Sequence, residues 1–213
     1  MSNIFDLVAA GDLSAIEAVI AADPGLLAAR HPSGASPIAW SAYMGKPEIA
    51  ARLAAAKGAI DPFEAIILGD LDALEGHLAT DWDPNTLSPD GFPPLALAAF
   101  FGHLPLFERL LPLTRDLDRR ADNPQQVAAI HAAAASRQSR MVEALLRAGA
   151  DPNVTQQNGF RPVHTAAQHG DAAMTGLLLL FGADRFARSG DGLDAAARAE
   201  RAGHTWLAQR LRA

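Results

Sequence analysis

Cysteine is absent from the 213-residue sequence, and aromatic residues make up only 6% of it. The absence of cysteine excludes disulfides, thiolate metal sites and cysteine nucleophiles, and it fits a reducing compartment. Valine, isoleucine and threonine are sparse whereas alanine is abundant, and this balance favours helices over strands. The hydrophobic share of 49% is typical of a globular chain that buries a large core.

Long apolar segments are also lacking. No apolar run, that of residues 177–181 included, is nearly long enough to cross a bilayer. The N-terminal stretch MSNIFDLVAAGDL has no basic segment before its apolar residues, and it contains Asp6 and Asp12. A secretion signal needs that basic segment, so we expect a cytoplasmic protein without a membrane interaction.

Charge is distributed unevenly along the chain. Residues 1–107 contain 4 Lys and Arg against 13 Asp and Glu, whereas residues 108–213 contain 14 against 11. A protein that follows a nucleic-acid backbone needs a positive surface along its contact with the phosphates. The acidic N-terminal half therefore argues against nucleic-acid binding.

Internal repetition is the strongest signal in the sequence. Gly149-Ala150-Asp151 recurs 33 residues later at Gly182, and His131 recurs at His164. The segment NGFRPVHTAAQHGD at 158–171 aligns with 90–103, with 33–46 and, less well, with 191–204. Each copy predicts a glycine turn, a short helix, a second glycine and an apolar helix. Such a unit exposes apolar surface on both sides and needs a copy of itself on each flank.

These motifs resemble the ankyrin repeat, most closely at Arg161-Pro162-Val163-His164, Gly170-Asp171 and Gly182-Ala183-Asp184. The resemblance covers essentially the whole chain, with weaker copies at 4–20 and 63–78. It implies an all-α solenoid of about seven helix–turn–helix repeats, about 14 helices, with short β-turn fingers between repeats. We expect one domain, 1–213, with repeats at about 3–33, 34–60, 61–90, 91–122, 123–156, 157–189 and 190–213.

Two irregularities refine this expectation. Only four residues, Ala-Ile-Asp-Pro, separate Gly58 from Phe63, which predicts that the finger between the second and third repeats is missing. The last unit carries many polar residues, which is typical of a terminal cap and suggests a complete, monomeric array. These residues are Arg198, Glu200, Arg201, Gln209, Arg210 and Arg212.

Catalytic and metal-binding patterns are not found. His131 and His164 occupy the helix-start position of the family, where the ring bonds to neighbouring backbone. The segment 81–85 (DWDPN) lacks the glycine and glutamate that a calcium loop needs at its sixth and twelfth positions, so we interpret it as a turn. No phosphate loop, nucleophile elbow or zinc-protease motif is present. We therefore expect a non-catalytic protein without metal or cofactor.

The resemblance also implies which positions face a partner, namely the residue after the turn glycine and the last two residues of each first helix. The partner-binding candidates at these positions are Tyr43, Met44, Phe92, Phe100, Phe101, Phe160 and His169. Each aromatic ring has the alternative of packing against the adjacent repeat or the base of a finger. Trp82 fits either an exposed finger tip or a plug beneath the turn.

A second set of candidates is basic. Arg188 joins Arg115, Arg119, Arg120 and Arg185 on predicted fingers, where the arginines either steer an acidic partner or are ordinary solvated charge. The sequence thus predicts a protein–protein interaction module that binds through a concave groove and finger tips. The alternative is a regulatory or inhibitory subunit that occludes the active site of a partner enzyme.

Overall fold

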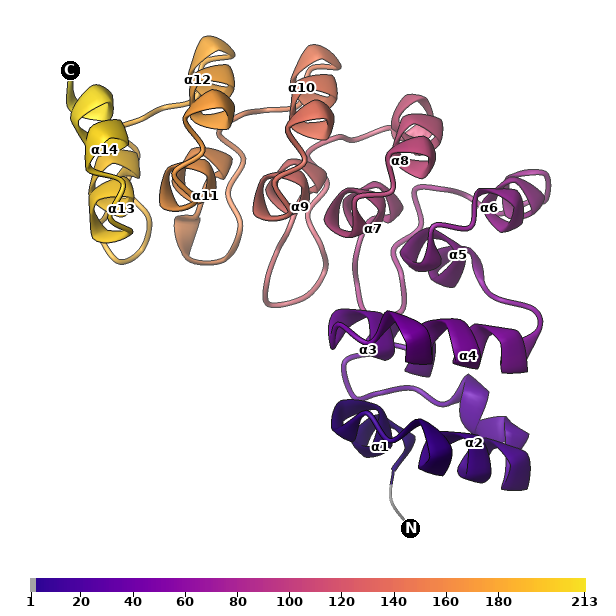
Figure 1. Ribbon diagram of the computed structural model, residues 1–213. Coiled ribbons are helices and arrows are strands. Elements are labelled where there is room, and N and C mark those ends of the chain that lie inside the picture. Colours follow the sequence, from indigo (N-terminus) through magenta and orange to yellow (C-terminus); the bar gives the residue numbers. More distant parts are fainter. Residues whose placement is uncertain (1–2) are drawn as a thin grey trace. The chain divides into compact units, whose positions relative to one another are not determined.

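The computed structural model describes residues 3–213, which form short helices joined in pairs (Figure 1). The described residues contain 14 α-helices in seven hairpins and no strand, which confirms the all-α expectation. The helices are α1 (Ile4–Ala10), α2 (Leu13–Ala22), α3 (Pro37–Tyr43), α4 (Pro47–Lys57), α5 (Pro62–Leu68), α6 (Leu71–Leu78), α7 (Pro94–Phe101), α8 (Leu104–Leu110), α9 (Ala129–Ala135), α10 (Ser139–Arg147), α11 (Pro162–Gln168), α12 (Ala172–Leu180), α13 (Ala195–Arg201) and α14 (Thr205–Arg212). Three 3-10 turns accompany them: η1 (Pro24–Ala28), η2 (Leu111–Leu113) and η3 (Gln157–Gly159).

Local sequence explains where the helices begin and end. Pro37, Pro94 and Pro162 each open a helix, as expected for a residue whose missing N–H is not needed there. Three of the second helices, α2, α6 and α12, open on the aspartate of a Gly-Asp motif, and this carboxylate accepts the backbone N–H three residues on at 2.9–3.0 Å. Gly149 and Gly182 end α10 and α12 with φ of +100° and +92°, which confirms the predicted left-handed turns.

The chain packs as two compact units, Met1–Asp83 with Ser88–Gly91, and Pro84–Leu87 with Phe92–Ala213. In the first unit, α3 packs against both α1 and α5. Its core combines Ile4, Phe5 and Val8 of α1 with apolar residues of α2, α3 and α4. The single domain with seven repeats at the ranges given above stays a prediction.

In the second unit the first helices of the four repeats form a continuous row. Helix α9 packs between α7 and α11, and α11 packs in turn against α13 (Figure 1). The facing surfaces are built from alanine; Ala132, Ala133 and Ala134 of α9 are at most 2% exposed. Because these side chains are small, neighbouring helices approach closely.

The two buried histidines connect each helix start to the following link. The Nδ1 of His131 accepts the backbone N–H of Ala128 at 3.2 Å, and its Nε2 donates to the carbonyl of Val154 at 3.0 Å. His164 repeats this pattern, with Nε2 2.8 Å from the carbonyl of Ala187. The predicted structural role of these rings is confirmed.

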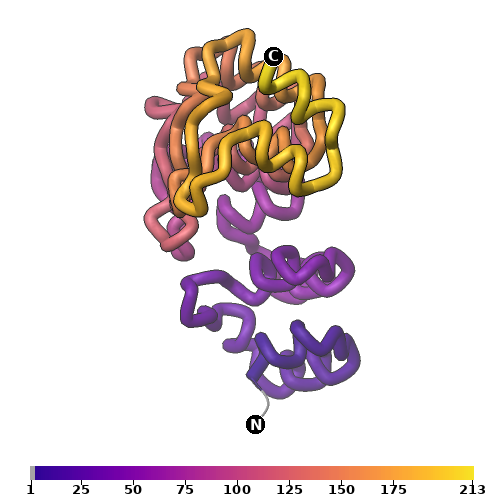
Figure 2. The backbone as a smooth tube through the Cα atoms, turned by 90° about the vertical axis from the view of Figure 1, so that its left-hand side faces the viewer, coloured from indigo at the N-terminus to yellow at the C-terminus, as the bar shows by residue number. Residues whose placement is uncertain are grey.

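Long links between repeats lie side by side in the second unit (Figure 2). Each link closes on itself through a backbone hydrogen bond, such as Gln156 N–H to Phe160 O at 2.8 Å. Neighbouring links are joined by side chains: the Asp118 carboxylate accepts the N–H of Asp151 at 2.9 Å, and the Asn153 amide oxygen accepts the N–H of Asp184 at 2.8 Å. These closed links are the fingers that the repeat pattern predicts.

The link between α4 and α5 is different. Helix α4 ends at Lys57 and α5 begins at Pro62, so only residues 58–61 connect the second and third hairpins. This spacing leaves no room for a finger, as the sequence predicts. The capping box of Asp61 and Glu64 starts α5 directly after the link.

Candidate partner-binding surface

Two of the candidate residues, Tyr43 and Met44, lie in the first unit at the end of α3. The Tyr43 hydroxyl donates to the Asp90 carboxylate at 2.8 Å, and Ser88 Oγ donates to the other oxygen at 2.5 Å. Burial and the adjacent Asp90 raise the pKa of Tyr43 far above its usual value. Met44 is 43% exposed. Tyr43 therefore stabilises the link with its hydroxyl, and Met44 presents more side chain to a partner.

Phe100 and Phe101 end α7 in the second unit. Phe100 is 48% exposed, and its ring meets Phe101 edge-on with centroids 5.2 Å apart. Phe101 is half-buried and stacks on His103 at 6.2 Å. The hydroxyl of Ser136 donates to the backbone carbonyl of Phe100 at 2.6 Å, which ties this end of α7 to the next repeat. Phe100 is thus an exposed ring on a well-supported base.

Phe92 and Phe160 are half-buried. Phe160 lies beneath the guanidinium of Arg198, 3.8 Å from the ring centroid, and meets the His164 ring at 5.5 Å. Arg198 also donates to the carboxylate of Asp191 at 2.7 Å and is only 8% exposed. The sequence interpretation that Arg198 lies on the polar surface of a cap is therefore wrong, because the Phe160 ring and Asp191 hold it inside.

His169 and Arg188 lie on different elements of the second unit. His169 follows α11 and is half-buried; its Nδ1 is buried without a hydrogen-bond partner. Burial first, and then the nearby charge of Arg137, lowers the pKa of this ring. Arg188 is exposed and donates to the carbonyl of Gly192 at 3.3 Å within its own finger.

The other predicted arginines are spread over the fingers. Arg115, Arg119 and Arg120 are exposed, and Arg120 donates to the carbonyl of Thr155 at 3.4 Å. The guanidinium of Arg185 lies 4.7 Å from the ring centre of Phe186. Trp82 is half-buried, and its ring meets Phe63 edge-on at 5.9 Å. It is therefore a plug beneath the turn rather than an exposed tip.

Sequence reasoning missed three exposed apolar side chains of the second unit. Leu180 at the end of α12 is 80% exposed, Phe186 in a finger 63% and Trp206 in α14 61%. Leu180 was detectable, because it aligns with Arg147, an exposed residue of the preceding second helix. Their exposure on second helices and a finger adds a surface that the family positions do not include.

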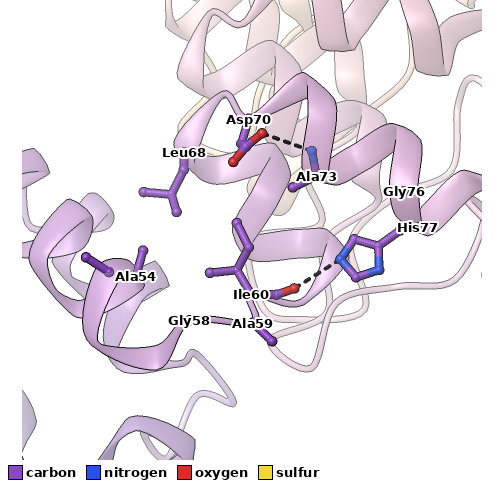
Figure 3. Close-up of a pocket in the computed structure, with 10 residues that line it drawn as sticks. Ala54, Gly58, Ala59, Ile60, Leu68, Asp70, Ala73, Gly76 and His77 are labelled. Atoms are coloured by element: carbon purple, nitrogen blue, oxygen red, sulfur yellow. Dashed lines mark hydrogen bonds between the residues drawn. The ribbon is translucent and has the colours of Figure 1, made fainter.

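A shallow groove of about 560 Å³ lies in the first unit beside the short link (Figure 3). Its walls include Ala54 and Gly58 on one side and Ala73 and Gly76 on the other. The ring of His77 bonds to the carbonyl of Ile60 at 3.0 Å, and the Asp70 carboxylate accepts the N–H of Ala73 at 2.9 Å. Both polar side chains therefore bond within the chain, and the remaining lining is apolar, with alanine and glycine beside Ile60 and Leu68.

Residues 3–213 contain no group of three or more His, Cys, Asp or Glu side chains placed to hold a metal ion. Within the same residues, none of the helices has the length and hydropathy that crossing a membrane requires. The histidines with the best-defined partners, His131 and His164, bond to backbone carbonyls. The described surface offers apolar and cationic contact area, at Phe100, Leu180 and the exposed finger arginines.

Comparison with known proteins identifies the family. A family model described as "Ankyrin repeats (3 copies)" matches residues 63–156 and 130–212, which together make up more than half of the chain. The chain therefore belongs to the ankyrin-repeat family, whose members are generally protein–protein interaction modules.

A weaker match points to the same family. The chain is 33% identical over 103 residues to the ankyrin repeat and SAM domain-containing protein 6 of Mus musculus. The match covers 47% of this chain and 11% of the mouse protein, so the chain spans only a small part of this relative's length.

Proposed function

We propose that this chain is a monomeric cytoplasmic protein that holds a partner protein on the ends of its first helices and on its finger tips, without chemistry of its own. The observation that carries the proposal is the exposure of Phe100 at 48% on a base of Phe101 and α9. A rigid aromatic ring that stays accessible buries a large area on binding at little entropic cost.

The other candidates support this role in different ways. Met44 is the accessible apolar side chain at the corresponding end of α3. Tyr43 of the first unit, and Phe92, Phe101 and Phe160 of the second, are half-buried. Each ring holds the surface of its own unit in shape while offering part of a face. Arg188 and His169 add polar contacts at the edge, where they fix orientation rather than supply most of the affinity.

The test is capture by the immobilised chain from a lysate of its own source, quantified by mass spectrometry. Phe100→Ser removes the exposed ring, whereas Leu180→Ser removes an even more exposed apolar side chain from α12. We expect Phe100→Ser to lose most of the captured partner and Leu180→Ser to retain it. Both substitutions lie at the surface and leave helicity unchanged. Equal capture by both variants and the original chain contradicts the proposal.

A further inference from the structure

One residue breaks a regular pattern in the hairpin turns. Each of the seven hairpins turns between its helices through a residue with positive φ. Six of these residues are glycines: Gly11, Gly45, Gly69, Gly102, Gly170 and Gly203. The fifth hairpin has Arg137 instead, with φ +57°. A side chain in this conformation is strained, whereas glycine adopts it readily.

Available space does not explain the exception. At Gly102 and Gly170 a side chain would collide with the next repeat, since an added Cβ would lie 2.5 Å from Gln138 and 2.4 Å from the His204 ring. At Gly45 and Gly203, however, nothing lies within 4 Å, and glycine is present nonetheless. The backbone conformation alone thus accounts for glycine in open turns. Arg137 retains a strained backbone, and such residues concentrate at functional sites.

The surroundings of Arg137 supply the rest of a binding patch. Its neighbour Ser136 is bonded to the carbonyl of Phe100, whose ring is 48% exposed. His169 lies close enough on the next repeat for the charge of Arg137 to affect its titration. Asp171, which follows on the same turn as His169, uses its carboxylate to accept the N–H of Met174 at 2.9 Å. Arg137 forms no ion pair among residues 3–213. Arg137 as a residue is exposed to solvent.

We propose that Arg137, between Phe100 and His169, binds a carboxylate in an acidic segment of the partner, while an apolar side chain of the same segment covers Phe100. This inference rests on the proposed function and specifies the chemistry of the partner. A guanidinium matches a carboxylate with two parallel N–H donors. The net charge of the second unit is consistent with an acidic partner segment. The unit contains 14 arginines against 11 acidic residues, and a positive net charge attracts a negative segment.

The test uses the full chain labelled with ¹⁵N and a capped peptide of the repeat Glu-Phe-Glu-Leu, titrated by NMR. We expect amide shifts at Phe100, Ser136, Arg137 and His169, and a Kd that Arg137→Gly raises roughly tenfold. Because Arg137→Gly relieves the backbone, it raises the thermal midpoint while it weakens binding. This opposite sign separates a loss of contact from a loss of fold.

Two controls make the result specific. Arg140→Ala removes the same charge from an exposed residue of α10 three positions along the chain and leaves the Kd within about twofold, since a solvated charge without a direct contact contributes little. The peptide with Gln for Glu binds at least tenfold more weakly. The inference is overturned by absent shifts at millimolar Glu peptide, by equal binding of the Gln peptide, or by equal losses in Arg140→Ala and Arg137→Gly. Partner capture that needs Phe100 but tolerates Arg137→Gly overturns this inference and leaves the proposed function standing.

Discussion

The ammonium of Lys57 lies 2.6 Å from Oε2 of Glu64, at the link that lacks a finger. Glu64 occupies the helix-start position that His131 and His164 fill in later repeats, and it accepts the N–H of Asp61 at 2.9 Å as their Nδ1 atoms accept an equivalent N–H. Each histidine also donates from Nε2 to a carbonyl of the following finger, and a carboxylate has no proton to donate in this way. Glu64 instead accepts a hydrogen bond from Lys57, which fits a hairpin that no finger precedes.

Lys57→Met should therefore be costly, because it leaves the Glu64 side chain, 2% exposed, without its counter-charge. We expect a loss of about 3 kcal/mol in the free energy of unfolding, measured with urea. The double variant Lys57→Met, Glu64→Leu should recover most of this loss. Arg52→Met is the control, since its pair with Glu17 is exposed and worth less than about 1 kcal/mol. Equal losses for Lys57→Met and Arg52→Met would show that the buried pair has no special role.

The buried histidine of α9 predicts sensitivity to acid. Burial lowers the pKa of His131 from 6.5 to about 4. Between pH 4 and pH 6.5 this histidine is therefore protonated in the unfolded chain and neutral in the folded chain. The stability that follows from this pKa difference is fully present above pH 6.5 and decreases as the pH is lowered toward 4. We expect a contribution of about 2 kcal/mol to be lost between pH 7 and pH 5. Urea unfolding at both pH values checks this, and His131→Gln should have a smaller difference between them.

Backbone strain at Arg137 can be measured separately from binding. With φ at +57°, Arg137→Gly should be more stable than Arg137→Ala by about 1 kcal/mol, because alanine keeps the Cβ that causes the strain. Both variants remove the same charge, so their difference isolates the backbone. Thermal unfolding of the two proteins decides the point; an alanine variant as stable as the glycine variant would mean that the turn is unstrained.

The contact of Arg198 with Phe160 and Asp191 should stabilise the last hairpin. Arg198→Ala removes a buried cation from the ring and leaves Phe160 less covered, and we expect a loss of about 2 kcal/mol. Arg201 reaches the same aspartate at only 4.0 Å with a side chain that is 75% exposed. Arg201→Ala should change stability by less than about 0.5 kcal/mol. Hydrogen exchange in α13 and α14 would report the difference, which disappears if Arg198 contributes no more than Arg201.

The sequence was sufficient for features that depend on near neighbours. Helix starts at Pro94 and Pro162, left-handed ends at Gly149 and Gly182, and the short link after Lys57 follow from local conformational preferences. The helix-start histidines were also predictable, because the two repeats that carry them present the same environment to the ring. Recurrence of these signals every 33 residues made the fold recognisable before any packing was known.

The candidate surface was less predictable because exposure depends on partners far away in the sequence. Tyr43 bonds to Asp90, 47 residues later, and Arg198 covers Phe160 across two elements. Nothing local distinguishes these half-buried rings from Phe100. Arg137 is an exception: aligning the seven turns would have identified the single residue that is not glycine, although not the neighbours that make it a candidate contact.

The side-chain bridges between fingers have a direction. The carboxylate of Asp118 holds an amide that belongs to the following finger, and Asn153 does the same one repeat later. Replacing Asp118 by alanine therefore releases backbone around Asp151, not around the substituted residue. Limited proteolysis of that variant would cut about 33 residues downstream of the change. A substitution in one finger of this part of the chain therefore loosens the next finger toward the C-terminus.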